Sequence, residues 1–139
     1  MIDALRFLGV SRLALATPYP EEVSASEARF LDANGFAVVS HACLGRSGAA
    51  VRPTRFDEII DLAKRVDRAD AQAIFISCTG LRALEVVDQL EQELSKPVLT
   101  SNQVTFWAIL RALRISHRPT GFGRLLRLGD EAVRPPSGI

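Results

Sequence analysis

Short apolar runs alternate with amphipathic segments along this chain, and that alternation constrains the fold more than any other feature. The four apolar runs are residues 13–16, 36–39, 73–76 and 97–99. The segments with apolar residues at helical spacing are 21–33, 57–66, 81–94 and 104–113. The third run is continuously apolar, as expected of a strand covered on both faces. Repeated strand–helix units with right-handed crossovers predict a four-stranded parallel sheet between helical layers, an α/β three-layer sandwich.

Length and charge exclude several classes of protein. A chain of 139 residues corresponds to about one domain. Its 17 basic and 16 acidic residues leave a net charge of +1, which favours neither nucleic acid nor an anionic membrane as a partner. No apolar stretch approaches the roughly 18–20 residues that span a bilayer, and the first residues lack the order of a secretory signal. Two cysteines cannot form a disulfide framework, so we expect a reduced, cytoplasmic chain.

The residues that follow each apolar run are the candidate site, because parallel sheets bind ligands at the carboxyl ends of their strands. These segments are residues 17–19, 40–43, 77–80 and 100–103. Three of the four are small and polar, which suits a small anionic ligand better than a large flat cofactor. The glycine pattern of a dinucleotide site does not follow the first run, and the two Cys and two His lack metal-ligand spacing. We therefore expect no cofactor and no metal.

Cys78 is the sharpest candidate among these residues. It lies between a buried strand and a helix expected to begin at Leu81, so the backbone N–H groups of Thr79, Gly80 and Leu81 can point toward its sulfur. A helix N-terminus favours the thiolate, which can act as a nucleophile or proton acceptor, and the same N–H groups can hold a substrate carboxylate. The alternative is a small buried apolar residue, as free cysteine often is. Position alone leaves both open.

Cys43 and His41 carry weaker signals. No helix start follows Cys43, so a packing role at the strand end is favoured over catalysis. A lone histidine such as His41 is more often a satisfied surface or core residue than a base. Residues 45–48 resemble a phosphate loop only in composition, and we expect a flexible connection there.

Five motifs in a fixed order carry a resemblance to a known family. They are Thr17-Pro18-Tyr19, Ala42-Cys43-Leu44-Gly45, Ile76-Ser77-Cys78-Thr79-Gly80-Leu81-Arg82, Pro97-Val98-Leu99-Thr100-Ser101-Asn102-Gln103 with Phe106-Trp107, and Gly121-Phe122-Gly123-Arg124-Leu125-Leu126. With these motifs the chain resembles the aspartate/glutamate racemase superfamily, in the branch of maleate cis-trans isomerases and arylmalonate decarboxylases. The resemblance predicts one racemase-like α/β lobe over residues 1–126 and a C-terminal tail over residues 127–139.

The resemblance implies cofactor-independent chemistry on a small carboxylic acid, in a pocket between two similar lobes. Cys78 matches the cysteine of the second lobe, whose thiolate would add to the double bond of maleate or move a proton at a carbon next to a carboxylate. Tyr19 matches a pocket tyrosine that hydrogen-bonds a substrate carboxylate. Backbone N–H groups of Thr79 and Gly80 would bind the same anion. Ser101 and Asn102 would lie near the cleft.

Two departures from the family pattern shape the functional expectation. The chain resembles only the second lobe, and Cys43 does not replace the cysteine of the first. Isomerases tend to place an asparagine in the loop after Leu44-Gly45, where this chain has Arg-Ser-Gly-Ala-Ala at residues 46–50. We therefore expect a maleate isomerase-like lobe that needs a first lobe, either on a separate chain or through homo-oligomerisation. The alternatives are a non-catalytic remnant or interaction subunit, and an arylmalonate decarboxylase-like enzyme.

Overall fold

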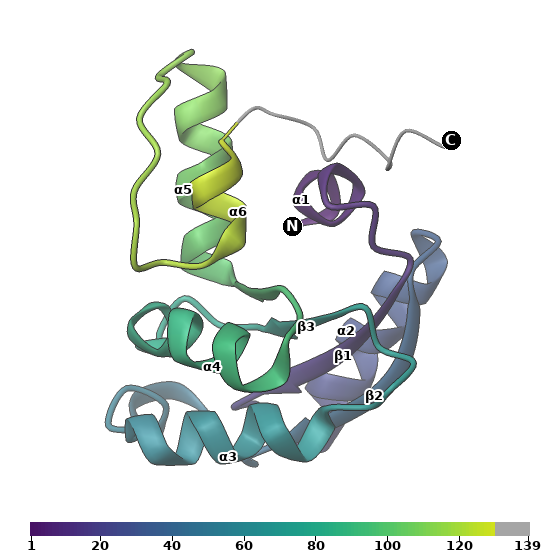
Figure 1. Cartoon of the computed structure of the whole chain (residues 1–139). Coiled ribbons are helices and arrows are strands. Elements are labelled where there is room, and N and C mark those ends of the chain that lie inside the picture. The colour runs from purple at the N-terminus through teal and green to yellow at the C-terminus, as the bar shows by residue number, and fades with distance from the viewer. Residues whose placement is uncertain (130–139) are drawn as a thin grey trace.

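A computed structural model describes residues 1–129 and shows a parallel sheet between layers of helices (Figure 1). The strands are β1 (Arg12–Thr17), β2 (Ala37–Cys43), β3 (Ala73–Ile76) and β4 (Val98–Thr100), in the order β2-β1-β3-β4. The α-helices are α1 (Ile2–Phe7), α2 (Glu21–Ala33), α3 (Phe56–Val66), α4 (Val87–Leu94), α5 (Ser101–Ala112) and α6 (Arg124–Leu128). The predicted α/β architecture with a four-stranded parallel sheet is confirmed. Most of the predicted tail, residues 130–139, lies outside the described residues.

The alternation of side chains along β1 divides the core into two clusters. Ala14 and Ala16 belong to the cluster on the α3 and α4 side of the sheet, whereas Leu13 and Leu15 belong to the cluster that includes residues of α1, α2, α5 and α6. All four are fully buried. Successive strand residues point to opposite faces, so a strand covered on both sides must be apolar at every position. The continuous apolar run that predicts β1 is the consequence of this double coverage.

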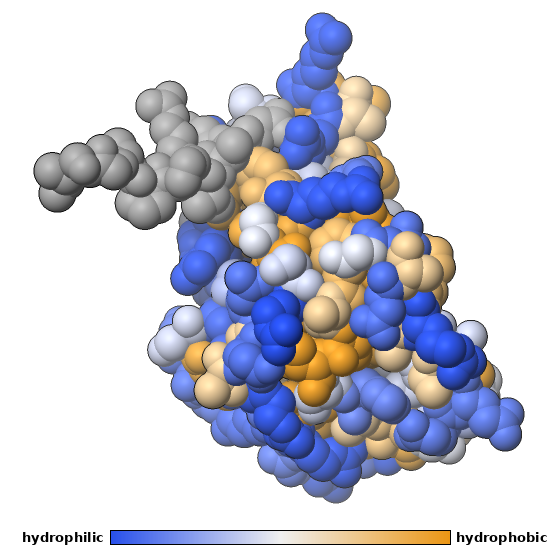
Figure 2. Space-filling model, turned by 90° about the vertical axis from the view of Figure 1, so that its right-hand side faces the viewer, coloured by the Kyte–Doolittle hydropathy of each residue, from blue (hydrophilic) through white to orange (hydrophobic). Residues whose placement is uncertain are grey.

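β2 lies at an edge of the sheet and is longer than its apolar run. It pairs with β1 as far as Thr17 opposite Cys43, so residues 40–43, which we expected to follow the strand, belong to it instead. Its residues are half-buried or exposed, which allows Ser40 and His41 in the strand. Figure 2, which views the molecule from the side of α1 and the β2 edge, shows apolar side chains in the middle of this face and polar ones around them.

Two helices begin at positions other than those expected. The segment predicted as a helix from Leu81 forms a 3₁₀ turn at Ala83–Val86 before α4 begins at Val87, because burial of Leu81, Ala83 and Val86 does not follow the α-helical period. The helix predicted from Val104 begins three residues earlier. A capping box explains this start: the Gln103 N–H donates to Thr100 Oγ1 at 3.1 Å, and Gln103 Oε1 accepts from the Thr100 N–H at 3.3 Å.

α1 and α6 were not expected from the sequence. α1 is only six residues long, and α6 lies beyond residue 113, where we predicted no further helix. α6 is held by α4: the Gly123 N–H donates to Asp88 Oδ1 and the Arg124 N–H donates to Glu91 Oε2, both at 2.8 Å. Burial raises the pKa of the Glu91 carboxyl, although hydrogen bonds from the Val98 and Arg124 N–H groups act to lower it. The contacts that Gly123 and Arg124 make with α4 join segments more than thirty residues apart, and local sequence patterns do not predict such contacts.

The attachment of α6 to α4 depends on a glycine at position 123, because there is no room for a Cβ atom there. Its φ is +85°, and a Cβ there would lie 2.4 Å from a Val87 methyl carbon. Gly121 has a similar φ of +86° but no atom within 4 Å of its would-be Cβ. We expect Gly121→Ala to lower the free energy of unfolding by about 1–2 kcal/mol from backbone strain alone. Gly123→Ala adds overpacking, for a total of about 2–5 kcal/mol.

Urea denaturation followed by circular dichroism measures both variants. Equal losses of unfolding free energy in the two variants would show that the close approach of Gly123 to α4 has no effect on the stability change.

Candidate active site

The predicted site residues come together at the carboxyl edge of the two central strands. β1 and β3 are paired in parallel with Ala16 opposite Ile76, so the segments that follow them start side by side. Ser101, the first residue of α5, accepts the Cys78 N–H with its Oγ at 3.0 Å. Asn102 donates its side-chain amide to the Thr79 carbonyl at 3.2 Å. The first turn of α5 therefore holds the segment that contains Cys78.

Cys78 occupies an unusual turn. Its φ is +127°, a region that residues with a side chain rarely adopt and that often marks functional sites. The Gly80 N–H donates to the Cys78 sulfur at 3.3 Å, whereas the Leu81 N–H donates to the Cys78 carbonyl. The expectation that three N–H groups of a helix start would point at the sulfur is therefore wrong as stated. The α-helix begins later, and the turn supplies the Gly80 N–H to the thiol.

Tyr19, two residues beyond the end of β1, is the side chain that interacts with the Cys78 thiol. Burial, followed by its contact with Cys78, raises the pKa of Tyr19 to about 12. The phenol therefore keeps its proton at every physiological pH. Its O–H group is a hydrogen-bond donor that can serve a thiolate or a substrate carboxylate.

Thr79, Gly80 and Asn102 line an open cavity of about 690 Å³ beside this turn. The other lining residues are Arg52, Leu81, Arg82, Leu84, Glu85 and Phe122. The Arg82 guanidinium pairs with Glu85 at 2.9 Å. Arg52 shows no ion pair or side-chain hydrogen bond within residues 1–129, so its charge is available to an anion. The sequence reasoning missed Arg52, although it lies in the loop after β2, one of the loops at the carboxyl edge of the sheet.

Cys43 and His41 are both engaged by the first residue of α2. The Cys43 thiol donates to Glu21 Oε2 at 3.2 Å, and His41 Nε2 lies 2.8 Å from Glu21 Oε1. Burial and then the Glu21 carboxylate raise the pKa of the Cys43 thiol. This environment favours a neutral thiol and agrees with the packing role favoured for Cys43.

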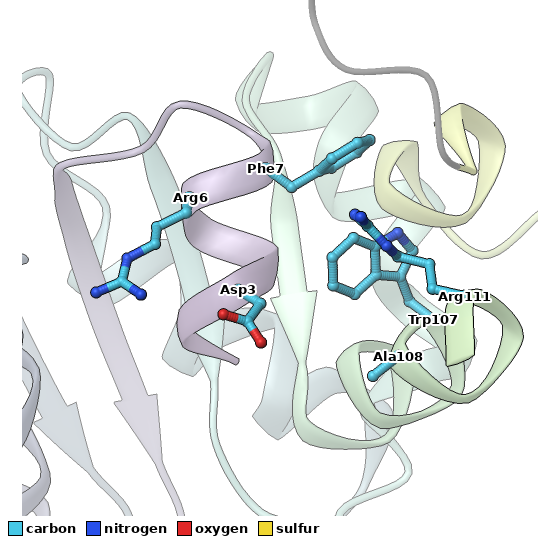
Figure 3. A pocket seen from close by; sticks show the side chains of 6 residues that line it. All are labelled: Asp3, Arg6, Phe7, Trp107, Ala108 and Arg111. Carbon is cyan, nitrogen blue, oxygen red and sulfur yellow. The ribbon is translucent and has the colours of Figure 1, made fainter.

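A second hollow, of about 540 Å³, lies between α1 and α5 (Figure 3) and shares no lining residue with the cavity beside Thr79 and Gly80, which Cys78 itself does not line. The Phe7 and Trp107 rings lie 5.2 Å apart in a tilted arrangement, and the Arg111 guanidinium lies 4.6 Å from the Trp107 ring centroid. Trp107 is 3% exposed. Its place in the fifth helix is explained by this contact between helices, which stabilises the docking of α1.

Within residues 1–129, no cluster of three or more His, Cys, Asp or Glu side chains is arranged to hold a metal ion. None of the helices in the same range has the length and apolar character needed to cross a membrane.

Comparison with known proteins decides the family. Residues 1–126 match the family model of arylmalonate decarboxylase. The chain belongs to the arylmalonate decarboxylase family. It is 34% identical over 130 residues to the arylmalonate decarboxylase of Bordetella bronchiseptica, covering 90% of this chain and 54% of that protein. It is 30% identical over 135 residues to the maleate isomerase of Nocardia farcinica, covering 96% of this chain and 53% of that protein.

Solved structures of this family share the fold. The maleate cis-trans isomerase of Nocardia farcinica, as a cysteine-to-serine variant with a covalently bound succinylcysteine intermediate, matches with a TM-score of 0.87 at 27% identity, over 91% of this chain and 52% of that one. A structure of arylmalonate decarboxylase matches with a TM-score of 0.80 at 30% identity, over 90% and 55%. The branch predicted from the five motifs is confirmed. The chain spans about half the length of the curated relatives it matches.

The contact between Cys43 and Glu21 can be tested with iodoacetamide, which reacts with thiolates. We expect Glu21→Gln to raise the alkylation rate of Cys43 at pH 7 roughly threefold, because it removes a charge and an acceptor that favour the neutral thiol. Mass mapping of peptides separates the two cysteines. Glu22→Gln, an exposed neighbour on α2, is the matched control. An unchanged rate in Glu21→Gln would contradict the contact.

Proposed function

We propose that this chain supplies the cysteine-bearing lobe of a cofactor-independent isomerase acting on a small dicarboxylic acid of the maleate type. The observation that carries the proposal is the placement of Cys78. Its thiol lies at the carboxyl edge of the sheet beside the Gly80 N–H and the Tyr19 hydroxyl. Two kinds of relative support it, namely curated maleate isomerases and a solved isomerase that, with one of its cysteines replaced by serine, holds a succinyl group on another cysteine.

The proposed chemistry uses Cys78 as the catalytic residue. Its thiolate adds to one carbon of the double bond, so that a C–S bond forms and the π electrons move to the other carbon, next to a carboxylate. Rotation about the resulting single bond brings the carboxylates to opposite sides. The C–S bond then breaks, the double bond re-forms as the trans isomer, and the thiolate leaves unchanged. No net proton or electron is consumed.

The neighbours of Cys78 supply binding and electrostatic stabilisation. The Gly80 N–H stabilises the thiolate both before addition and as it leaves. Tyr19 and the backbone N–H groups of Thr79 and Gly80 bind the nearer carboxylate, and Ser101 with Asn102 hold the turn in place. Arg52 reaches the farther carboxylate from the loop after β2, where isomerases tend to place an asparagine.

A complete pocket needs a first lobe opposite Cys78, which we propose comes from a separate chain or a second copy of this one. The chain covers about half of its relatives, and the cavity beside Cys78 is open. α5 and the residue that caps its C-terminus expose large apolar side chains, with Phe106, Ile109 and Leu113 at 42%, 49% and 64% exposure. Such a surface is suited to contact with another protein.

A decarboxylase is the second candidate, because the family model and a 34% identical relative carry that name. In that reaction a C–C bond to one carboxylate breaks, CO₂ leaves with its carbon, and the Cys78 thiol gives its proton to the carbon that retains the electron pair. The same thiol and carboxylate-binding groups serve both reactions.

Turnover of maleate, followed by loss of its ultraviolet absorbance, tests the proposed function. The chain is assayed alone and with the N-terminal half of the Nocardia farcinica maleate isomerase added as a separate polypeptide. We expect turnover that falls by at least about a hundredfold in Cys78→Ser and persists in Cys43→Ser, since only Cys78 forms the covalent bond. If the wild-type chain, Cys78→Ser and Cys43→Ser are equally inactive with the added N-terminal half present, the chain is a non-catalytic family member. Release of CO₂ from an arylmalonate instead identifies a decarboxylase.

Arg52 gives a separate prediction on substrate binding. We expect Arg52→Gln to raise the KM for maleate about five- to fiftyfold with little change in kcat, because a charged hydrogen bond to the bound carboxylate is lost. Arg55→Gln is the control, since the Arg55 side chain is already paired with Asp57. Similar effects in both variants would show that general positive charge, and not Arg52, attracts the substrate.

A further inference from the structure

One side of α5 faces solvent without a single charged residue. A row of four side chains runs along it: Asn102, Phe106, Ile109 and Leu113, the residue that caps the helix. Spacings of four, three and four residues place them within about 60° of one another around the helix axis. The three apolar members are among the large apolar side chains that the structure leaves exposed. We call this row the α5 stripe.

The opposite side of α5 is already occupied by the rest of the chain. Val104 and Trp107 are buried in the core cluster that includes residues of α1 and α6, and both of these helices lie on the same side of α5 (Figure 1). Arg111, the one charged residue of α5, packs over the Trp107 ring. A surface helix of a monomer normally presents polar and charged side chains to water. The α5 stripe departs from that pattern, which indicates contact with another polypeptide.

The exposed apolar area has the size that a protein interface needs. Ile115 and Phe122, in the segment that follows α5, are also large, apolar and exposed. Together with the three apolar members of the stripe they offer roughly 400 Å² of apolar surface, taking about 150–200 Å² for each whole side chain. A stable interface buries about 800 Å² on each partner, of which somewhat more than half is apolar. These five side chains therefore supply most of the apolar part of one such interface.

The α5 stripe starts at the open cavity beside Thr79 and Gly80. Asn102, its first member, lines that cavity, and so does Phe122. A partner seated on the stripe therefore also lies across the mouth of the cavity.

The spacing along the stripe is symmetric, and this symmetry identifies the partner as a second copy of the chain. The midpoint between positions 106 and 109 is also the midpoint between 102 and 113. When two α5 helices pack antiparallel about that midpoint, Phe106 of each copy lies opposite Ile109 of the other, and Asn102 lies opposite Leu113. Each pair of contacts occurs twice, as a two-fold interface requires. The stripe is thus complementary to itself.

The charges at the ends of the stripe agree with this arrangement. Arg114 follows Leu113, and its side chain has no ion pair or hydrogen bond within residues 1–129. Because Leu113 lies opposite Asn102 of the other copy, Arg114 reaches the open cavity that Asn102 lines there. The cavity lining includes Glu85, which binds Arg82 through Oε1 and keeps Oε2 for a second cation. A guanidinium of one copy therefore meets a carboxylate of the other at both ends of the interface.

We infer that the α5 stripe is the contact surface between two copies of this chain, which pack their α5 helices antiparallel and cover each other's open cavity. The inference rests on the proposed function, since it names the partner that closes the site of Cys78. In this arrangement Arg114 of one copy becomes part of the cavity wall of the other.

Sedimentation velocity tests the assembly. At about 50 µM we expect a species with twice the 15.2 kDa mass of one chain. Ile109→Glu should raise the Kd of the dimer at least about a hundredfold, because it buries two like charges beside the two-fold axis. Phe30→Glu, at an exposed apolar position of α2, is the matched control and should leave the dimer intact. Circular dichroism checks that both variants fold.

Disulfide cross-linking tests the antiparallel register, and it decides the matter if Ile109→Glu does not fold. Asn102→Cys and Leu113→Cys are prepared separately in a chain that also carries Cys43→Ser and Cys78→Ser. We expect the mixture of the two variants to form disulfide-linked dimers at least about tenfold faster than either variant alone. Positions 102 and 113 face each other across the axis, whereas identical positions lie about 16 Å apart along the helices, too far for a disulfide.

Four outcomes overturn the inference: a wild-type chain that stays monomeric at about 100 µM, a dimer that survives Ile109→Glu, equal loss of the dimer in Phe30→Glu, or cross-linking no faster in the mixture than in either variant alone. A monomeric chain that binds the N-terminal half of the Nocardia farcinica maleate isomerase would instead assign the stripe to a separate lobe. These measurements need no turnover. A dimer that does not turn over maleate therefore contradicts the proposed function alone, and a monomer that does so contradicts the dimer alone.

Discussion

The parallel pairing of β1 with β3 is the interaction on which the rest of the molecule depends. These strands occupy the centre of the sheet, and Leu13 to Ala16 pair with Ala73 to Ile76 residue by residue. Both strands are covered on both faces, so each of these eight paired side chains adds to one of the two core clusters. Because the strands are parallel, their carboxyl ends open at the same edge. Tyr19 and Cys78 meet there although 59 positions separate them along the chain.

The turn that follows β3 combines strain with compensation. A cysteine at φ +127° is costly by itself, but its N–H is taken by Ser101 and the Thr79 carbonyl by Asn102. α5 can provide both because its capping box starts the helix at the end of β4, beside β3. A backbone held from two sides keeps the thiol in one orientation, as a nucleophile requires. On this geometry we base the proposal that Cys78 is the catalytic cysteine.

The chain spans about half the length of its curated relatives, and we propose that it holds one side of an active site. What it holds is chemically specific: a thiol with an N–H donor, a phenol that stays protonated, and a guanidinium without a partner in the described residues. In this proposal, the exposed apolar side chains of α5 form the surface that the first lobe would cover.

The amino-acid sequence by itself determined the fold class, the bounds of α2 and β3, and the choice of Cys78, because apolar period, strand-end position and motif order are local properties. It also placed Tyr19, Ser101 and Asn102 at the same edge, since the parallel topology follows from the order of strands and helices. Only the tertiary structure decided the late start of α4, the existence of α6, and the position of Arg52 in the cavity lined by Thr79 and Gly80. Those depend on contacts between segments far apart in the chain. No local pattern encodes such contacts, because they arise only when packing brings the segments together.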